Sequence, residues 1–151
     1  MADALSEENI RAFTAAWYNA LDIHAPLEDV LKMLADNGTG LEIVFPEKTA
    51  HTTEEFKVWY DAVTHFFFDE NHNVVSVEIR ESTTDTATLG VVVAWQASWF
   101  NPPAAKSKRT SMNATQKWVV RKSNKNAFGL EILFYNATEK PFEYAPGFAR
   151  L

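Results

Sequence analysis

The sequence has no cysteine, no long apolar run and no cluster of basic residues. The lack of cysteine excludes disulfide frameworks, thiolate zinc sites and cysteine nucleophiles. The 14 basic and 20 acidic residues give a net charge of −6, which disfavours binding to a phosphate backbone. No segment approaches the ~20 apolar residues of a membrane helix, and the N-terminus lacks the pattern of a signal peptide. We therefore expect a cytoplasmic protein with neither nucleic acid nor membrane as a partner.

What the chain does contain is apolar and aromatic side chains. Hydrophobic residues make up 46% of the 151 positions, and aromatic residues make up 13%. A chain of this length suits one domain with a sizeable core. We expect a single domain over residues 1–151.

The first half of the sequence predicts helices. Ser6 is a plausible N-cap for a helix whose apolar residues recur at helical spacing up to Leu21. Pro26 suits the first turn of a second helix, for which Gly38 would be a left-handed stop. Residues 41–45 form a short apolar strand pattern, and Thr52 with Glu55 has the spacing of a capping box for a third helix.

The second half predicts antiparallel strands. The apolar period changes from 3.6 to 2 near residue 75, and strand patterns run over residues 86–100, 111–121 and 129–136. Turns are expected at residues 83–85 and 123–126, and Pro102 and Pro103 end the longest strand because neither can donate to a ladder. Helices followed by a run of strands predict an α+β fold, in which a strongly curved sheet leaves a cone-shaped hollow.

The chain resembles the nuclear transport factor 2-like superfamily, in particular its SnoaL-like branch. The residues that carry the resemblance, between about residues 10 and 137, are FTAAWYNAL, LEDVLKMLAD, LEIVFPE, TTEEFKVWYDAV, TQKWVVRK and FGLEILFYN. The resemblance implies a mainly antiparallel cone with a pocket lined by the first helix, the end of the first strand, the third helix and the concave sheet face. It does not imply one function, because the superfamily includes isomerases, dehydratases, polyketide cyclases and proteins without known chemistry.

The residues expected at the implied pocket do not decide whether a reaction takes place there. Ketosteroid isomerase-like members place an aspartate base just before a proline at the end of the first strand, where this chain has Phe45. The four histidines form no metal-binding motif, so we expect no metal and no cofactor. His72 is interpreted as part of a solvated turn. His51, before the third helix, is either structural or a proton-transfer group at the mouth of the cone.

Aromatic side chains are more numerous than a small core needs. They either pack against the helices or line a cavity for a ring-shaped apolar ligand. Polar residues within the strand patterns could orient such a ligand, Asn113, Gln116 and Glu131 among them. If Glu131 faces inward, its pKa would be raised and it could act as an acid or base, but the strand pattern leaves its face undecided. The candidate ligand-binding residues are Trp17, Phe45, Phe56, Trp59, Tyr60, Trp95, Trp99, Asn113 and Trp118, with His51 and Glu131 as catalytic candidates.

Two functions follow as hypotheses. The first is a small apolar-ligand-binding domain without chemistry, favoured by the missing carboxylate and by the lack of any recognisable acid–base pair. The second is a cofactor-independent SnoaL-like isomerase, cyclase or dehydratase that transfers protons on a cyclic or polyketide-like substrate. Apolar residues on both faces of the strand over residues 86–100 also predict a homodimer. The C-terminal tail would cover the pocket mouth or cross to the partner.

Overall fold

The computed structural model describes residues 3–151. Within these residues the chain forms three helices and a seven-stranded sheet. The elements are α1 (Glu7–Asp22), α2 (Leu27–Leu31), β1 (Glu42–Val44), β2 (Thr49–Ala50), α3 (Thr53–Phe66), β3 (Phe67–Ser82), β4 (Thr86–Trp99), β5 (Lys108–Lys122), β6 (Leu130–Asn136) and β7 (Glu143–Tyr144).

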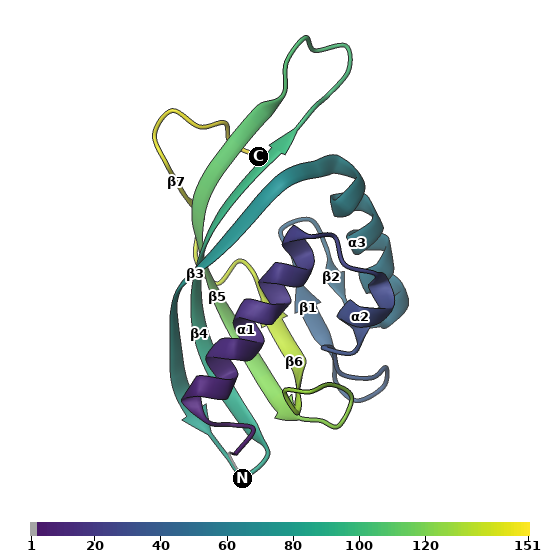
Figure 1. Cartoon of the computed structure of the whole chain (residues 1–151), viewed down its shortest axis with the longest axis vertical. Coiled ribbons are helices and arrows are strands. Elements are labelled where there is room, and N and C mark those ends of the chain that lie inside the picture. The colour runs from purple at the N-terminus through teal and green to yellow at the C-terminus, as the bar shows by residue number, and fades with distance from the viewer. Residues whose placement is uncertain (1–2) are drawn as a thin grey trace.

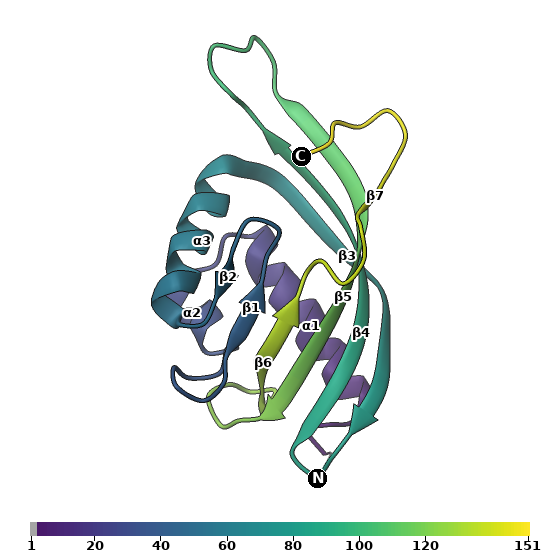
Figure 2. The same cartoon turned by 180° about the vertical axis from the view of Figure 1, so that it is seen from behind.

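The sheet is curved, and the helices occupy its concave side. Its strand order is β2-β1-β6-β5-β4-β3, and β7 pairs with β5 off this path. All of these pairings are antiparallel except that of β1 with β6. Figure 1 shows α1 lying across the bent strands with α3 beside it, and Figure 2 shows the opposite face of the sheet without a helix. The predicted α+β cone is confirmed.

The helix starts follow the predicted capping chemistry, but the second helix is shorter than expected. The Ser6 side chain accepts a hydrogen bond from the Asn9 backbone, and Thr52 accepts one from Glu55, so each satisfies a free N–H at a helix start. The second helix ends at Leu31 and does not reach Gly38. Backbone groups beyond Leu31 pair with Ile132 of β6 instead of continuing the helix.

The apolar faces of the long strands build the core. The face of β4 that carries Leu89, Val91 and Val93 is buried, as the alternating pattern predicts. In β6 a register shift against β5 changes the alternation, so that Leu130, Ile132 and Tyr135 are all buried. This irregularity explains why a simple period-2 pattern left the faces of β6 undecided.

No helix among residues 3–151 is long and apolar enough to span a membrane.

Candidate functional site

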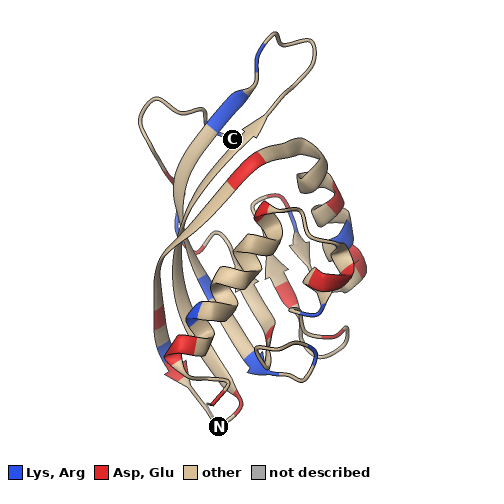
Figure 3. Ribbon diagram, viewed as in Figure 1, with Lys and Arg blue, Asp and Glu red and all other residues tan. Residues whose placement is uncertain are grey.

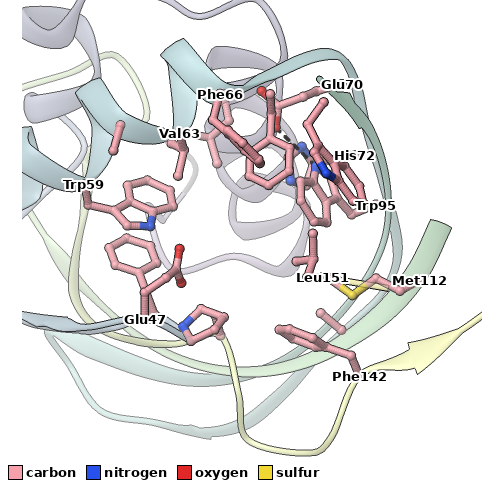
Figure 4. A pocket seen from close by; sticks show the side chains of 18 of the residues that line it. Glu47, Trp59, Val63, Phe66, Glu70, His72, Trp95, Met112, Phe142 and Leu151 are labelled. Atoms are coloured by element: carbon pink, nitrogen blue, oxygen red, sulfur yellow. Dashed lines mark hydrogen bonds between the residues drawn. The ribbon is translucent and has the colours of Figure 1, made fainter. Parts of the chain in front are cut away.

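A cavity of about 620 Å³ opens between α3, the curved sheet and the C-terminal tail. Its walls are mostly apolar and aromatic, and Figure 4 shows their side chains converging on one hollow. The tail contributes Phe142, Arg150 and Leu151, which places the tail against the cavity of its own chain. The aromatic residues of the wall are Phe45, Trp59, Tyr60, Phe66, Phe67, Trp95, Trp99, Tyr135 and Phe142.

One histidine lines this cavity, and a carboxylate holds its imidazole ring. Asp22, the last residue of α1, accepts a hydrogen bond from the His72 backbone N–H at 2.9 Å, and its other oxygen lies 2.5 Å from His72 Nδ1. The His72 side chain is 11% exposed and that of Asp22 is 18% exposed. Because an ionised carboxylate only accepts, Nδ1 donates in this contact, and in the neutral ring Nε2 is then the nitrogen with the lone pair. No other residue among 3–151 hydrogen-bonds to the His72 ring.

Two aromatic rings fix the plane of this imidazole. The Tyr18 ring stacks on the imidazole of His72 with ring centroids 4.9 Å apart. The Trp95 ring also stacks on this imidazole, with ring centroids 5.8 Å apart. The ring therefore can neither tilt nor turn without displacing a neighbour. His72 is fixed in β3 and lines the cavity, which corrects the interpretation of this residue as part of a solvated turn. The pair with Asp22 also corrects the view that the chain lacks an acid–base pair.

Behind the stack lies a buried polar network. The Tyr18 hydroxyl and the Trp118 indole N–H both donate to Gln116 Oε1, the latter at 3.0 Å. Burial, followed by the neighbouring Tyr135 phenol, raises the pKa of Tyr18 well above its usual value. Burial likewise raises the pKa of Tyr135. Both phenols therefore stay protonated at neutral pH, and the Tyr18 hydroxyl donates to Gln116.

Two carboxylates line the cavity, those of Glu47 and Glu70. Glu70 of β3 contacts His24 and accepts a hydrogen bond from Trp95, drawn as a dashed line in Figure 4. Burial, followed by the charge of Glu70, raises the pKa of Tyr60. Figure 3 shows an acidic segment near the start of β3 and a basic segment near the start of β5. The cavity is thus apolar with charged groups at restricted positions.

The predicted ligand-binding residues separate into two layers. Five of them line the cavity: Phe45, Trp59, Tyr60, Trp95 and Trp99. Phe45 and Trp59 stack with ring centroids 3.6 Å apart and form one flat wall. Trp17, Phe56 and Trp118 are fully buried in the core and do not line the cavity. Gln116, expected as an orienting polar residue, does line it.

The remaining predicted site residues lie elsewhere. His51 is 60% exposed and contacts Glu42, outside the cavity lining. Glu131 is buried, but it pairs with Arg121 at 2.6 Å and Lys125 at 3.4 Å, not with the cavity. Asn113 is exposed on β5 opposite the tail strand β7. The structure therefore does not bring together His51, Glu131 and Asn113 at one site.

The paired residues at and near the cavity that the sequence analysis did not select share one local pattern. Asp22-Ile23-His24 and Glu70-Asn71-His72 are both carboxylate-X-histidine tripeptides. In the fold they pair crosswise, Asp22 with His72 and His24 with Glu70. The repetition is visible in the sequence, but the crossing depends on the end of α1 meeting the start of β3. Among residues 3–151 no group of three or more histidine and acidic side chains could hold a metal ion.

No family model and no curated protein matches the chain in sequence. Several solved structures match its fold. A protein of unknown function with a cystatin-like fold from Nostoc punctiforme has a TM-score of 0.68 and 19% identity, covering 99% of this chain and 98% of that one. A hexachlorocyclohexane dehydrochlorinase from Novosphingobium barchaimii has a TM-score of 0.71 and 11% identity, covering 95% and 92%. The β subunit of the benzoate 1,2-dioxygenase from Burkholderia mallei has a TM-score of 0.68 and 12% identity, covering 90% and 91%.

Identities this low show the fold alone. The chain has a cystatin-like fold, which is the fold that the sequence resemblance implied. The functions named for these neighbours differ from one another, so the function of this chain has to be argued from its own cavity.

Proposed function

We propose that the protein is a cofactor-independent enzyme in which His72 removes a proton from a carbon atom of an apolar cyclic substrate. The observation that carries this proposal is that His72 lines the aromatic cavity and is held by Asp22. A general base needs an unprotonated nitrogen within reach of the substrate and a pKa near working pH, and imidazole is the side chain that most often meets both needs.

The role of Asp22 follows from its two contacts. By accepting from both the backbone and the ring of His72, the carboxylate fixes the tautomer that leaves Nε2 free. When Nε2 takes the proton, the ring becomes a cation, and the adjacent carboxylate stabilises that charge. The low exposure of the pair strengthens this attraction relative to water.

The cavity supports an apolar ring as the substrate. Its volume of about 620 Å³ is within the usual range for small-molecule sites. The flat Phe45–Trp59 wall can stack on a planar ring. Loss of a proton from a saturated carbon of a ring needs a group that takes up the electron pair of the C–H bond. In an elimination the pair forms a double bond as a leaving group departs with its own bonding pair, and in an isomerisation the pair passes to an adjacent carbonyl group. The dehydrochlorinase with this fold is named for a reaction of the first kind.

Exchange of carbon-bound hydrogen tests the proposal without knowledge of the natural substrate. In D₂O, proton NMR would follow the loss of the α-proton signals of 2-tetralone, an apolar bicyclic ketone. We expect the wild-type protein to accelerate this exchange, and His72→Gln to lower the acceleration about 100-fold or more, because general base catalysis is typically worth 10²–10⁴. His51→Gln, an exposed histidine with its own carboxylate, is the matched control and should be unchanged.

Binding without chemistry is the second candidate function, favoured by the predominance of apolar side chains in the wall. A wild-type protein that binds 2-tetralone but exchanges its protons no faster than His72→Gln would establish this second function. The same result would contradict the first.

Two further proposals concern assembly and compartment. We propose a homodimer through the outer face of the sheet, where Val92 and Ala94 are half-buried and the neighbouring Phe100 is exposed in the single chain. Light scattering that finds a monomer at high micromolar concentration would contradict it. A cytoplasmic location, with neither nucleic acid nor membrane as a partner, is proposed on composition alone.

A further inference from the structure

A second histidine–carboxylate pair, which the proposed proton transfer does not use, presents its carboxylate to the cavity. Glu70 Oε2 lies 2.7 Å from His24 Nε2, and Glu70 Oε1 accepts a hydrogen bond from Trp95 Nε1 at 3.2 Å. The Glu70 side chain is 7% exposed, less than that of any other residue in the two pairs. A carboxylate this deep in an apolar wall needs a reason, because burial of a charge is unfavourable unless it is compensated.

The backbone is distorted on both sides of this pair. His24 and Asp69 both have φ of 51°, and they are the only non-glycine residues with positive φ among residues 3–151. Asp69 lies within the register shift between β3 and β4 that spans Phe68 and Asn71. Non-glycine residues in the left-handed region persist where the surrounding structure requires them, often at functional sites. One distortion is at His24 itself, and the other is at the residue before Glu70.

The two bonds of Glu70 do not use its full capacity. An ionised carboxylate offers about four acceptor positions, and the contacts with His24 and Trp95 occupy two. The carboxylate also lines the cavity, where Val63 and Phe66 are its apolar neighbours in the wall (Figure 4). The remaining positions can therefore accept a hydrogen bond from a molecule in the cavity.

Glu70 and His72 are close enough for one molecule in the cavity to reach both side chains. They are two residues apart on β3 and both line the cavity, so their Cα atoms are at most about 7 Å apart. Trp95 links them, since it is stacked with the His72 ring and donates to Glu70. One or two fused six-membered rings can present a hydroxyl group to Glu70 and a C–H bond to His72 at this spacing.

We propose that Glu70 is a specificity-determining residue that selects apolar rings carrying a hydroxyl group. This inference rests on the proposed function and names the substrate class of the same cavity. A ring hydroxyl donates a charge-assisted hydrogen bond to the carboxylate, and such bonds are roughly twice as strong as neutral ones. A ring with fluorine at the same position has no donor, and it places a partial negative charge against the carboxylate.

Equilibrium dialysis with two nearly isosteric probes tests this selection. At pH 7, 2-naphthol carries the donor and 2-fluoronaphthalene does not. We expect the wild-type protein to bind 2-naphthol at least about tenfold more tightly, and Glu70→Gln to weaken 2-naphthol binding about tenfold with little change for 2-fluoronaphthalene. Glu42→Gln is the matched control, because Glu42 also contacts a histidine but lies outside the cavity.

The selective loss distinguishes recognition from a structural role. If Glu70→Gln weakens both probes equally, Glu70 only supports the cavity and the proposal is overturned. It is also overturned if the variant binds both probes like the wild type, or if the wild type shows no preference for 2-naphthol. Binding requires no proton transfer, so a Glu70-dependent preference without exchange of 2-tetralone protons would contradict the proposed enzyme function and leave the selectivity standing.

Discussion

Two histidine–carboxylate pairs of this protein have the same chemistry in opposite surroundings. His72 and Asp22 line or adjoin an aromatic cavity and are mostly buried, whereas His51 and Glu42 lie outside it with side chains 60% and 42% exposed. The inner contact is 2.5 Å long and the outer one is 3.2 Å. The difference shows that a histidine near a carboxylate is not by itself a site, because water screens the outer pair and gives it freedom to move.

The largest expected effect concerns the support beneath the inner pair. Trp118 is fully buried, and the centroid of its ring lies 5.8 Å from that of Tyr18. Tyr18 in turn stacks on His72. We expect Trp118→Ala to lower the free energy of unfolding by about 3–5 kcal/mol, through lost burial and the cavity it leaves. Urea denaturation would measure the change. Trp59→Ala, at the cavity wall, should cost less, and an equal cost would contradict the separation into core and wall.

The next effect compares the two carboxylates directly. Asp22→Asn should lower the exchange of 2-tetralone protons about 100-fold, because an amide can donate to Nδ1 and favour the wrong tautomer of His72. Glu42→Gln should leave the exchange rate within about twofold. Proton NMR of both variants in D₂O checks the comparison. Equal effects of the two substitutions would show that burial does not distinguish the pairs.

A smaller effect is expected from the phenols behind the inner pair at high pH. The pKa of Tyr18 and that of Tyr135 are raised in the folded state, so the fold binds their protons more tightly than the unfolded chain does. Their contribution to stability is complete below about pH 10, the usual tyrosine pKa, and is lost as the pH rises through the folded-state values. Each such group gives a slope of about 1.4 kcal/mol per pH unit in that window.

Tyr18→Phe isolates this contribution. Urea denaturation from pH 7 to pH 11 would measure the free energy of unfolding of both proteins. Relative to its own value at pH 7, the free energy of unfolding should fall less steeply with rising pH in the variant than in the wild type. Identical slopes would mean that the ionised Tyr18 phenol is tolerated in the folded state.

The smallest effect belongs to the outer pair. A double-mutant cycle with His51→Gln and Glu42→Gln should give a coupling free energy below about 0.5 kcal/mol, since exposed ion pairs are screened and flexible. Thermal denaturation of the four proteins at pH 6 measures it. A coupling above about 1 kcal/mol would remove the contrast between the two pairs as far as stability is concerned.

Much of the fold could be predicted from local patterns. Ser6 and Thr52 identify helix starts because the capping interaction joins residues three positions apart. The alternation from Ala87 to Trp99 identifies the buried face of β4 because strand geometry forces it. The second helix was predicted too long, since the pairing of residues 33–35 with Ile132 involves a strand almost a hundred positions away.

The candidate site could be predicted only in part. Phe45, Trp59, Tyr60, Trp95 and Trp99 were expected at the cavity and line it, because large aromatic residues on inward faces reach whatever hollow the sheet encloses. Trp17, Phe56 and Trp118 have the same residue type and the same inward direction, but they lie deeper. How deep an inward-facing side chain lies below the cavity wall produces no periodic pattern in the sequence.

By itself, the sequence determined the order of helices and strands, the inward faces and the aromatic character of the hollow, because these follow from contacts between near neighbours in the chain. Tertiary structure alone decided which ionisable groups meet. Asp22 and His72 are 50 residues apart, and they pair because the end of α1 lies against the start of β3. Glu131, in contrast, is drawn to Arg121 and away from the cavity by the register of β5 with β6. A partner chosen by strand register or helix packing has no fixed spacing in sequence, so the chemistry of this protein appears only when the chain is folded.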